Sequence, residues 1–181
     1  MTNPPTCPST ANTAGEGSVS LSAQPGTPSA APDVQDRIRA SFERQGLMRH
    51  LGARLSHIGR GWVHIVLPSR PEITQQHGYI HAGATSAIAD SAGGYAALTM
   101  FGPDDEVLTV EYKINLLAPA AGDHLEAVGT VVKSGRTLTV CHLEVFAVTG
   151  ERRMPVAVGQ QTLICLPASG HHRQQGPDGP G

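Results

Sequence analysis

Gln75-Gln76-His77-Gly78-Tyr79-Ile80-His81-Ala82-Gly83-Ala84-Thr85-Ser86-Ala87-Ile88-Ala89-Asp90 is the most informative segment of this 181-residue chain. An amide, an imidazole and a glycine-flanked turn precede a run of small, mostly apolar residues, which is typical of a buried helix. A single carboxylate, Asp90, stands within that run. An unpaired charge in apolar surroundings is costly, so we expect Asp90 to have either a partner or a chemical role.

The helix that begins in this segment is predicted over residues 82–101, where Gly102-Pro103 ends it. It is apolar on nearly every side and carries Gly93-Gly94 at its centre, so a sheet can approach it closely. It is too short to cross a bilayer comfortably, and Asp90 interrupts it, so it is a core helix. A curved antiparallel sheet wrapped around one long central helix is the hotdog architecture, and the expected fold class is α+β.

The segments on either side supply the rest of this fold. Residues 34–50 are expected to form an N-terminal helix with Asp33 as its N-cap. Residues 51–58 and 62–67 flank Gly59-Arg60-Gly61 and predict a hairpin. Short turns favour antiparallel neighbours among the four long strands that follow. Those strands are predicted over residues 106–117, 124–133, 137–148 and 154–166.

Composition divides the chain into three parts. Residues 1–33 are rich in Pro, Ser, Thr and Ala and carry almost no large apolar side chains, and residues 167–181 resemble them. Such segments cannot bury enough surface to offset the entropy of ordering, so both are predicted to be disordered. The sequence therefore predicts a single hotdog domain over residues 34–166.

Charge, cysteine content and hydropathy exclude several classes of function. The formal net charge is −2, so no basic excess indicates binding to nucleic acid or to a membrane surface. The spacing of Cys7, Cys141 and Cys165 fits neither a zinc site nor a disulfide framework. No signal peptide and no membrane span is recognisable. We therefore expect a cytoplasmic protein without a nucleic-acid or membrane partner.

The run His77-Gly78-Tyr79-Ile80-His81-Ala82-Gly83, followed by Asp90, resembles the motif of the hotdog acyl-CoA thioesterases of the PaaI-like family, the phenylacetyl-CoA thioesterase type. Gln75, His81 and Asp90 stand at the family's spacing, and residues 108–119 and 132–138 follow in the family's order. The likeness covers residues 45–166 approximately. Ala82 replaces the family's first Gly after the histidine, and Gln75 replaces the commoner Asn.

The resemblance implies hydrolysis of a small or medium acyl-CoA, with aromatic acyl groups among the candidates. The Ala82 N–H, beside that of Gly83 at the positive end of the helix, would polarise the thioester carbonyl. His81 would orient the turn, and Gln75 would hold the water or the carbonyl. Asp90 would be the general base, or the nucleophile through a mixed anhydride, and both roles remain open. Thr109 would position the attacking water.

Each candidate residue also has a purely structural interpretation. Asp90 could pair with an arginine, His81 could be a satisfied core histidine, and Gln75 could tie down its own loop. Thr109 could be an ordinary strand residue, because threonine favours strands.

The spacing of the site predicts an oligomer. Asp90 stands eight residues beyond Ala82, which is about 12 Å along a helix. One thioester cannot touch both groups in one subunit, whereas two antiparallel helices would bring Asp90 of one chain to Ala82 of the other. A homodimer is therefore required for the site, and the resemblance implies that a homotetramer is common.

Coenzyme A is part of the substrate, and no separate cofactor is expected. Lys133, Gly135 and Arg136 are candidates for contact with its phosphates, as are Arg152 and Arg153. Gly135-Arg136 also fits an ordinary hairpin turn. His77 and His81 lack acidic or cysteine partners, so no metal site is predicted.

An alternative function is a non-catalytic module that binds or senses acyl-CoA without turnover. The candidates for lining the acyl pocket are Met48, Trp62, Tyr79, Ile80 and Phe101.

Overall fold

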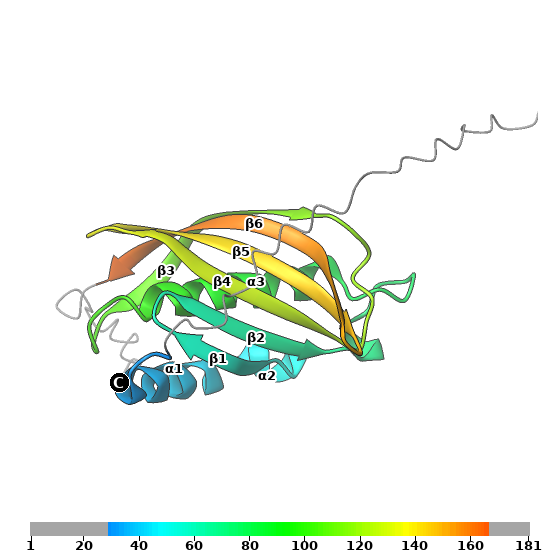
Figure 1. The fold of residues 1–181 in the computed structure, drawn as a ribbon, viewed down its shortest axis with the longest axis horizontal. Coiled ribbons are helices and arrows are strands. Elements are labelled where there is room, and N and C mark those ends of the chain that lie inside the picture. The colour runs from blue at the N-terminus through cyan, green and yellow to red at the C-terminus, as the bar shows by residue number, and fades with distance from the viewer. Residues whose placement is uncertain (1–28, 167–181) are drawn as a thin grey trace, which may run out of the picture.

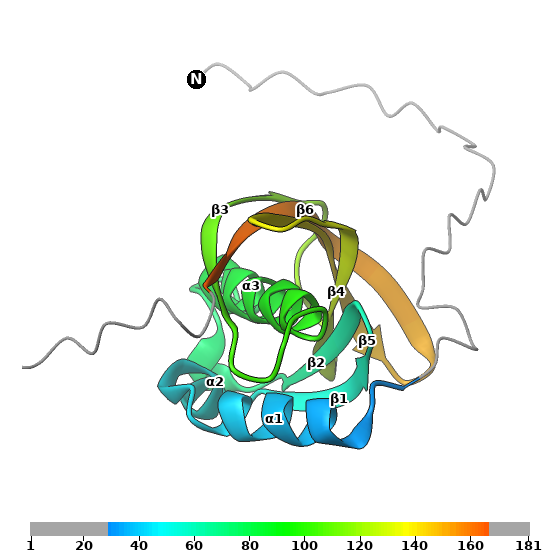
Figure 2. The same ribbon diagram turned by 90° about the vertical axis from the view of Figure 1, so that its left-hand side faces the viewer.

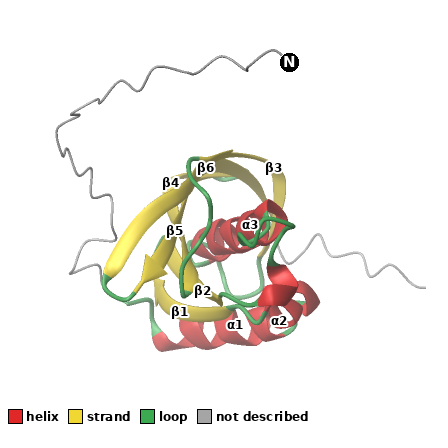
Figure 3. Ribbon diagram, turned by 90° about the vertical axis from the view of Figure 1, so that its right-hand side faces the viewer, coloured by secondary structure: helices red, strands yellow, loops and turns green. Residues whose placement is uncertain are grey.

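The computed structural model describes residues 29–166 as a six-stranded antiparallel sheet curved around one helix. Viewed along the central helix, α3, from either end, the sheet curves around it from the edge strand β3 to the edge strand β1, and α1 and α2 lie beside β1 (Figure 2, Figure 3). The α+β hotdog fold predicted from the sequence is confirmed. The helices are α1 (Pro32–Glu43), α2 (Gly46–Leu51), the 3-10 turn η1 (Pro71–Ile73) and α3 (Ala82–Leu98). The strands are β1 (Arg54–Gly59), β2 (Trp62–Pro68), β3 (Glu106–Leu116), β4 (His124–Ser134), β5 (Leu138–Thr149) and β6 (Arg152–Leu166).

The central helix is buried because its small side chains let the sheet approach its backbone. Ile88, Ala92 and Ala96 are fully buried on its sheet-facing side. Opposite them, Gly129 on β4 lies so close that a Cβ atom there would stand 2.3 Å from the Ala92 carbonyl carbon. A larger side chain at position 129 would clash with α3, so glycine is required there for steric reasons. Its small size allows the sheet to pack closely against the helix.

The order of strands in the sheet is β1-β2-β4-β5-β6-β3, so every strand except β3 pairs with a sequence neighbour (Figure 1). The β1–β2, β4–β5 and β5–β6 pairs are the antiparallel hairpins that short turns predicted. The expectation is wrong for β3 and β4, because both sides of β4 are occupied by β2 and β5 and β3 pairs with β6 instead. The connection passes the start of α3, where Ile80 N–H donates to Ala120 O at 2.9 Å.

The predicted N-terminal helix is two helices. Gln45 interrupts it in an extended conformation (φ −72°, ψ 105°), and its amide nitrogen donates to the Tyr95 hydroxyl at 2.9 Å. Asp33 is not the N-cap: Ala31 holds that position without a side-chain bond, and Asp33 lies in the first turn, where its charge complements the helix dipole. Leu51, predicted to begin a strand, ends α2 at Gly52, whose φ of +71° terminates the helix.

The remaining boundaries differ from prediction by a few residues. The central helix ends at Leu98, because the Thr99 hydroxyl donates to Ala96 O at 2.7 Å and accepts the Gly61 N–H at 2.7 Å. The folded region begins before residue 34, since Ala30 N–H donates to Ile58 O at 3.1 Å. Residues 1–28 and 167–181, predicted to be disordered, lie outside the described residues. Along the described chain, no helix has the length and apolarity that a membrane crossing needs.

Candidate active site

The loop before α3 is held in a tight turn by its own backbone. Gln75 N–H donates to Tyr79 O at 2.8 Å, and Gly78 N–H donates to Gln75 O at 2.9 Å. Gly78 has a φ of +83°, a conformation that favours glycine. The Gln75 side-chain oxygen accepts the His77 N–H, so this amide ties down its loop, one of its two predicted roles.

His81 is the N-cap of α3. Its Nδ1 accepts the Gly83 N–H at 2.8 Å, which fixes the unprotonated nitrogen as Nδ1 in the neutral ring. The predicted orienting role of His81 therefore has a geometric basis. Of the two N–H groups predicted to face the thioester, that of Gly83 is therefore already bonded to His81. The Ala82 N–H has no partner among the described residues. Both residues are exposed at the helix start.

Asp90 lies two turns further along α3 and is half-buried. The Thr109 hydroxyl donates to Asp90 Oδ1 at 2.8 Å. The Gln161 side-chain nitrogen lies 2.6 Å from the same Oδ1. No arginine or lysine within residues 29–166 forms an ion pair with Asp90, so the predicted structural alternative of an internal ion pair is not realised there. Both hydrogen bonds converge on Oδ1 and leave Oδ2 available for chemistry.

Gln161 is a site residue that the sequence analysis missed. It lies on β6 and is fully buried, and its side-chain nitrogen also lies 2.8 Å from Thr109 Oγ1. A signal was present in the sequence: Gln161 has the same strand parity as the buried Leu163, so it points into the core. An amide at a core-facing position of an apolar strand needs a polar partner.

Two separate cavities divide the candidate residues. The Asp90 cavity, of about 420 Å³, is lined by Asp90 and Thr109 together with residues of α1, α2 and β3. The His81 cavity, of about 520 Å³, is lined by Gln75, His81 and Ala82 together with residues 116–120. Neither cavity contains both the carboxylate and the helix start. This separation agrees with the distance of about 12 Å expected along one helix.

A polar network lines the wall of the Asp90 cavity beyond the carboxylate. Gln45 accepts from the Ser91 hydroxyl at 3.2 Å and donates to the Tyr95 hydroxyl, which lies 3.3 Å from Ser41 Oγ. Burial raises the pKa of the Tyr95 phenol, while its hydrogen bonds with Ser41 and Gln45 lower it, so the hydroxyl is neutral at pH 7. Apart from Glu106, the remaining wall is apolar and includes Leu47, Met48, Leu98, Val107 and Leu163.

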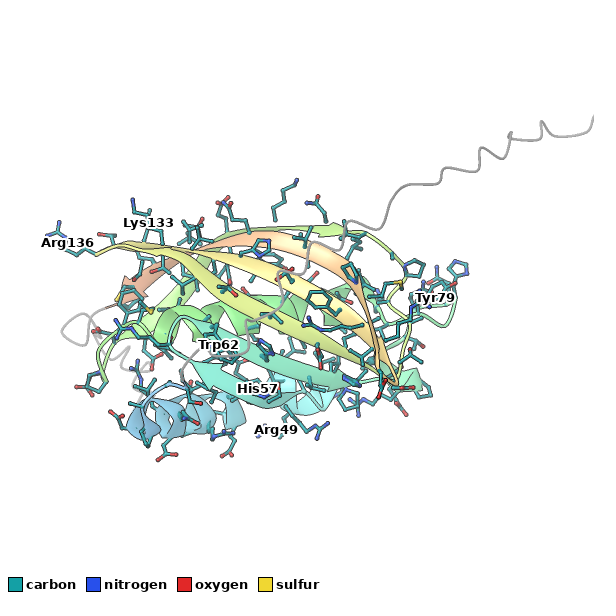
Figure 4. All side chains as sticks on the ribbon, in the orientation of Figure 1. Arg49, His57, Trp62, Tyr79, Lys133 and Arg136 are labelled. Atoms are coloured by element: carbon teal, nitrogen blue, oxygen red, sulfur yellow. The ribbon has the colours of Figure 1, made fainter. Side chains whose placement is uncertain are left out.

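The candidates for phosphate contact lie away from both cavities of their own chain. Lys133 and Arg136 project from the β4–β5 hairpin, at the end of the molecule opposite Tyr79 (Figure 4). Gly135 N–H donates to Leu138 O at 2.9 Å, so these residues form a hairpin turn. Arg153 is already engaged, since its Nε lies 2.8 Å from Glu126 and its guanidinium stacks on Phe146. The role of Lys133, Gly135 and Arg136 stays a prediction.

Of the residues predicted to line an acyl pocket, three lie on a cavity wall. Met48 lines the Asp90 cavity, and Tyr79 and Ile80 line the His81 cavity. Trp62 is on the outer face of the sheet, where its ring stacks on His57, and that prediction is wrong. Its strand parity is opposite to that of the fully buried Val63 and Ile65.

Comparison with known proteins identifies the family. A model of the thioesterase superfamily matches residues 77–153. A thioesterase family protein of known structure from Silicibacter pomeroyi is 41% identical, covering 74% of this chain and 98% of that one with a TM-score of 0.72. A Saccharolobus solfataricus protein, provisionally named an esterase, is 31% identical over 61% of this chain and 81% of its own length. The chain belongs to the thioesterase superfamily.

The fold comparison extends to the family that the motif resembles. The E. coli PaaI protein, from the phenylacetic acid degradation operon, matches with a TM-score of 0.69 at 20% identity, covering 77% of this chain and 97% of that one. This similarity shows a shared fold and agrees with the resemblance inferred from the motif. Together with the family membership, it identifies the chain as a thioester hydrolase of the hotdog type.

Proposed function

We propose that the protein hydrolyses a small or medium acyl-CoA to the free acid and coenzyme A. The observation that carries this proposal is the half-buried carboxylate of Asp90. One of its oxygens is held by two donors and the other is left free beside a cavity. A carboxylate held in this way can remove a proton from water or attack a carbonyl carbon, the two steps that open a thioester.

The helix start supplies the second requirement of the reaction. Negative charge develops on the thioester oxygen in the transition state, and the Ala82 N–H at the positive end of α3 is free to receive it. In one route Asp90 Oδ2 takes a proton from water, whose oxygen attacks the carbonyl carbon and displaces the CoA thiolate. In the other, Oδ2 attacks the carbonyl carbon and displaces the CoA thiolate, and water then hydrolyses the resulting mixed anhydride to the free acid and the Asp90 carboxylate. Thr109 and Gln75 would position water and substrate.

We propose a homodimer as the active unit, because the two halves of the site lie in different cavities of one chain. The edge strand β3 supports this assembly. It is eleven residues long, has no second neighbour in the sheet, and carries Leu108, Val110, Tyr112 and Leu116 at 46–57% exposure. A long, apolar, unpaired edge is a pairing surface that single chains avoid.

One stripe of α3 also remains uncovered in the single chain. Ala82, Ser86, Asp90 and Gly94 are exposed or half-buried, and they recur every four positions, so they share one face. Apart from Gly83 and Ala87 beside this face, the other residues of α3 are buried. Packing this face against its copy, antiparallel about a two-fold axis, would place Asp90 of one protomer beside Ala82 of its partner. A tetramer formed from two such dimers remains part of the proposal.

Substrate contacts follow from the same arrangement. An antiparallel dimer brings the Lys133–Arg136 hairpin of one protomer toward the end of the molecule where the partner's α3 begins, so these cations would bind the CoA phosphates. The apolar wall of the Asp90 cavity suits a compact hydrocarbon or aromatic acyl group, and its polar network suits one carrying a polar substituent. The cysteine pattern supports a cytoplasmic location.

The experiment is a panel of acyl-CoAs, both aliphatic and aromatic, with free CoA detected by a thiol reagent. Burial raises the pKa of the Cys141 thiol to about 12, so this cysteine adds little background. Turnover by the wild type and its loss in Asp90→Ala, with an unchanged circular dichroism spectrum, is the expected result. A folded wild type that releases no CoA from any substrate contradicts the proposal. Tight binding of intact acyl-CoA in that case, measured by calorimetry, would favour the non-catalytic alternative.

A further inference from the structure

Gln161 is a fully buried amide enclosed between α3 and the sheet. Its neighbours across the strands are Cys141 on β5 and Tyr112 on β3. Its side-chain nitrogen lies 2.6 Å from Asp90 Oδ1, 3.1 Å from the Asp90 backbone oxygen and 2.8 Å from Thr109 Oγ1. It lines neither cavity, so a bound substrate would not touch it.

The other end of the same amide is unsatisfied. Gln161 Oε1 is buried and has no hydrogen-bond partner within residues 29–166. It points at Gly93, where a Cβ atom would stand only 1.9 Å away. A buried carbonyl without a partner costs free energy, and a fold shaped only for stability would place an apolar side chain here. Gly93 leaves space for the amide of Gln161, and only the nitrogen of that amide forms hydrogen bonds.

The orientation of the amide is determined by its partners. Turning it over would place Oε1 against the Asp90 carboxylate, where two oxygens repel, so the nitrogen must face Asp90. Thr109 Oγ1 can only accept from that nitrogen, and its single proton is then directed to Asp90 Oδ1. The order of donation is thus Gln161 to Thr109 to Asp90, with a second bond from Gln161 directly to Asp90.

We propose that Gln161 is a positioning residue for the hydrolysis: it fixes the Asp90 carboxylate with Oδ2 facing the substrate and sets the direction of the Thr109 hydroxyl. This inference rests on the proposed function, because it assigns Asp90 to the reaction. Gln161 acts through Asp90 and Thr109 and does not itself contact the reacting atoms. It therefore affects the rate of the chemical step, whereas substrate binding does not depend on it.

The test is Gln161→Met, which keeps the length of the side chain and removes both polar ends. We expect kcat to fall on the order of 10- to 100-fold, because misplacing a reacting group has effects of this size. KM should remain as in the wild type, and the urea unfolding midpoint should be unchanged or higher, because the unsatisfied oxygen is gone. The control is Gln160→Met, the same change at the next residue, which is exposed on the opposite face.

A Gln161→Met enzyme with wild-type kcat overturns the proposal, and so does a loss of activity matched by a lower unfolding midpoint. Gln161→Glu supplies a second activity test: it keeps the shape but places oxygens against Asp90, so its kcat should fall at least as far. Wild-type kcat in that variant also overturns the proposal.

A second readout is independent of turnover. Gln161→Met is also introduced into Asp90→Ala, where the amide has already lost its carboxylate acceptor. We expect the substitution to raise the unfolding midpoint more in Asp90→Ala than in the wild type. Equal shifts in both backgrounds overturn the inference. If no acyl-CoA is hydrolysed by the wild type, the proposed function fails and this comparison alone decides whether Gln161 holds Asp90.

Discussion

Thr109 and Asp90 belong to different elements, yet the Thr109 hydroxyl donates a hydrogen bond of 2.8 Å to the Asp90 carboxylate. The register of β3 explains how they meet. Thr109 pairs with the buried Leu163, and the register then shifts between Thr109 and Glu111, so that Val110 is an extra residue. A bulge re-aims the side chains beside it. Thr109 therefore faces α3, while Glu111 accepts from Thr162 on the other face.

Replacing the hydroxyl at this position should slow the chemistry. Thr109→Val keeps the shape and strand preference of threonine but removes the donor to Asp90, so kcat should fall on the order of 10- to 100-fold. Thr109→Ser keeps the hydroxyl and should retain most activity. Steady-state kinetics on the best acyl-CoA checks both, with Thr162→Val as a control for threonine loss on the outer face. Equal rates in Thr109→Val and Thr109→Ser would remove the hydroxyl from the mechanism.

The N-cap of α3 gives a prediction about stability. His81→Ala removes the acceptor for the Gly83 N–H and should lower the free energy of unfolding by about 0.5–2 kcal/mol. His81→Asn offers another side-chain acceptor and should restore most of that stability. Urea unfolding measures the difference.

His77→Ala is the matched control, because His77 is exposed on the preceding loop and caps nothing among the described residues. If His81→Ala is as stable as the wild type, the imidazole does not cap the helix.

Local patterns in the sequence were sufficient for the elements of the fold. The apolar run after His81 predicted the core helix, and alternation predicted every strand to within a few residues. The place of β3 was not predictable in the same way, because pairing with β6 depends on which strand edges remain free after the hairpins have formed. Likewise, the break at Gln45 depends on a bond to Tyr95, fifty residues away, which no local pattern contains.

The candidate site was predictable only in part for the same reason. His81 and Asp90 stand in one segment, so their spacing along α3 could be read directly. Gln161 contributes from the last strand, 71 residues beyond Asp90, and only the folded sheet brings it to the carboxylate. The occupied Gly83 N–H likewise became apparent only with the orientation of the His81 ring.

The contact between β4 and α3 predicts strong intolerance at one glycine. Gly129→Ala would place a Cβ atom 2.3 Å from the Ala92 backbone, so the helix or the sheet must shift. We expect a loss of at least about 1–3 kcal/mol in the free energy of unfolding. Gly46→Ala is the control, because no atom lies within 4 Å of its Cβ position. That variant should be neutral or gain up to about 1 kcal/mol, and equal behaviour of the two would contradict the tight contact.

Burial of His64 predicts a loss of stability in acid. The pKa of His64 is lowered from 6.5 to about 4, chiefly by burial and also by His57 and Arg153, while Glu126 opposes these effects. Below pH 6.5 the unfolded chain binds a proton that the folded chain does not, so stability falls as the pH drops from 6.5 toward 4. The shift is worth at most about 3 kcal/mol, and less because the ring is partly exposed.

Urea unfolding at pH 7 and at pH 4.5 measures this effect. His64→Gln should lose less stability between the two pH values than the wild type does. His50→Gln, which removes an exposed histidine, should behave as the wild type does. If His64→Gln keeps the full wild-type pH dependence, another group is responsible.

The division of the site between two protomers can be tested by mixing inactive variants. Asp90→Ala lacks the carboxylate, and His81→Ala disturbs the helix start, so each homodimer should be nearly inactive. In a mixed dimer, the site formed by Asp90 of the His81→Ala chain and His81 of the Asp90→Ala chain is intact, while the other site lacks both groups. Random mixing makes half of the dimers mixed with one good site each, so about a quarter of wild-type activity should return.

The edge strand supplies the control for this mixing experiment. Tyr112→Asp places a charge on the apolar edge of β3 and should dissociate the dimer in analytical ultracentrifugation, and it should prevent any return of activity when built into both variants. Val132→Asp, a charge at a still more exposed position at the end of β4, should leave the dimer intact. If the whole site lay within one chain, mixing would restore no activity, because each chain would keep its own defect whatever its partner. If the two variants are dimeric and still fail to complement each other, the shared site is refuted.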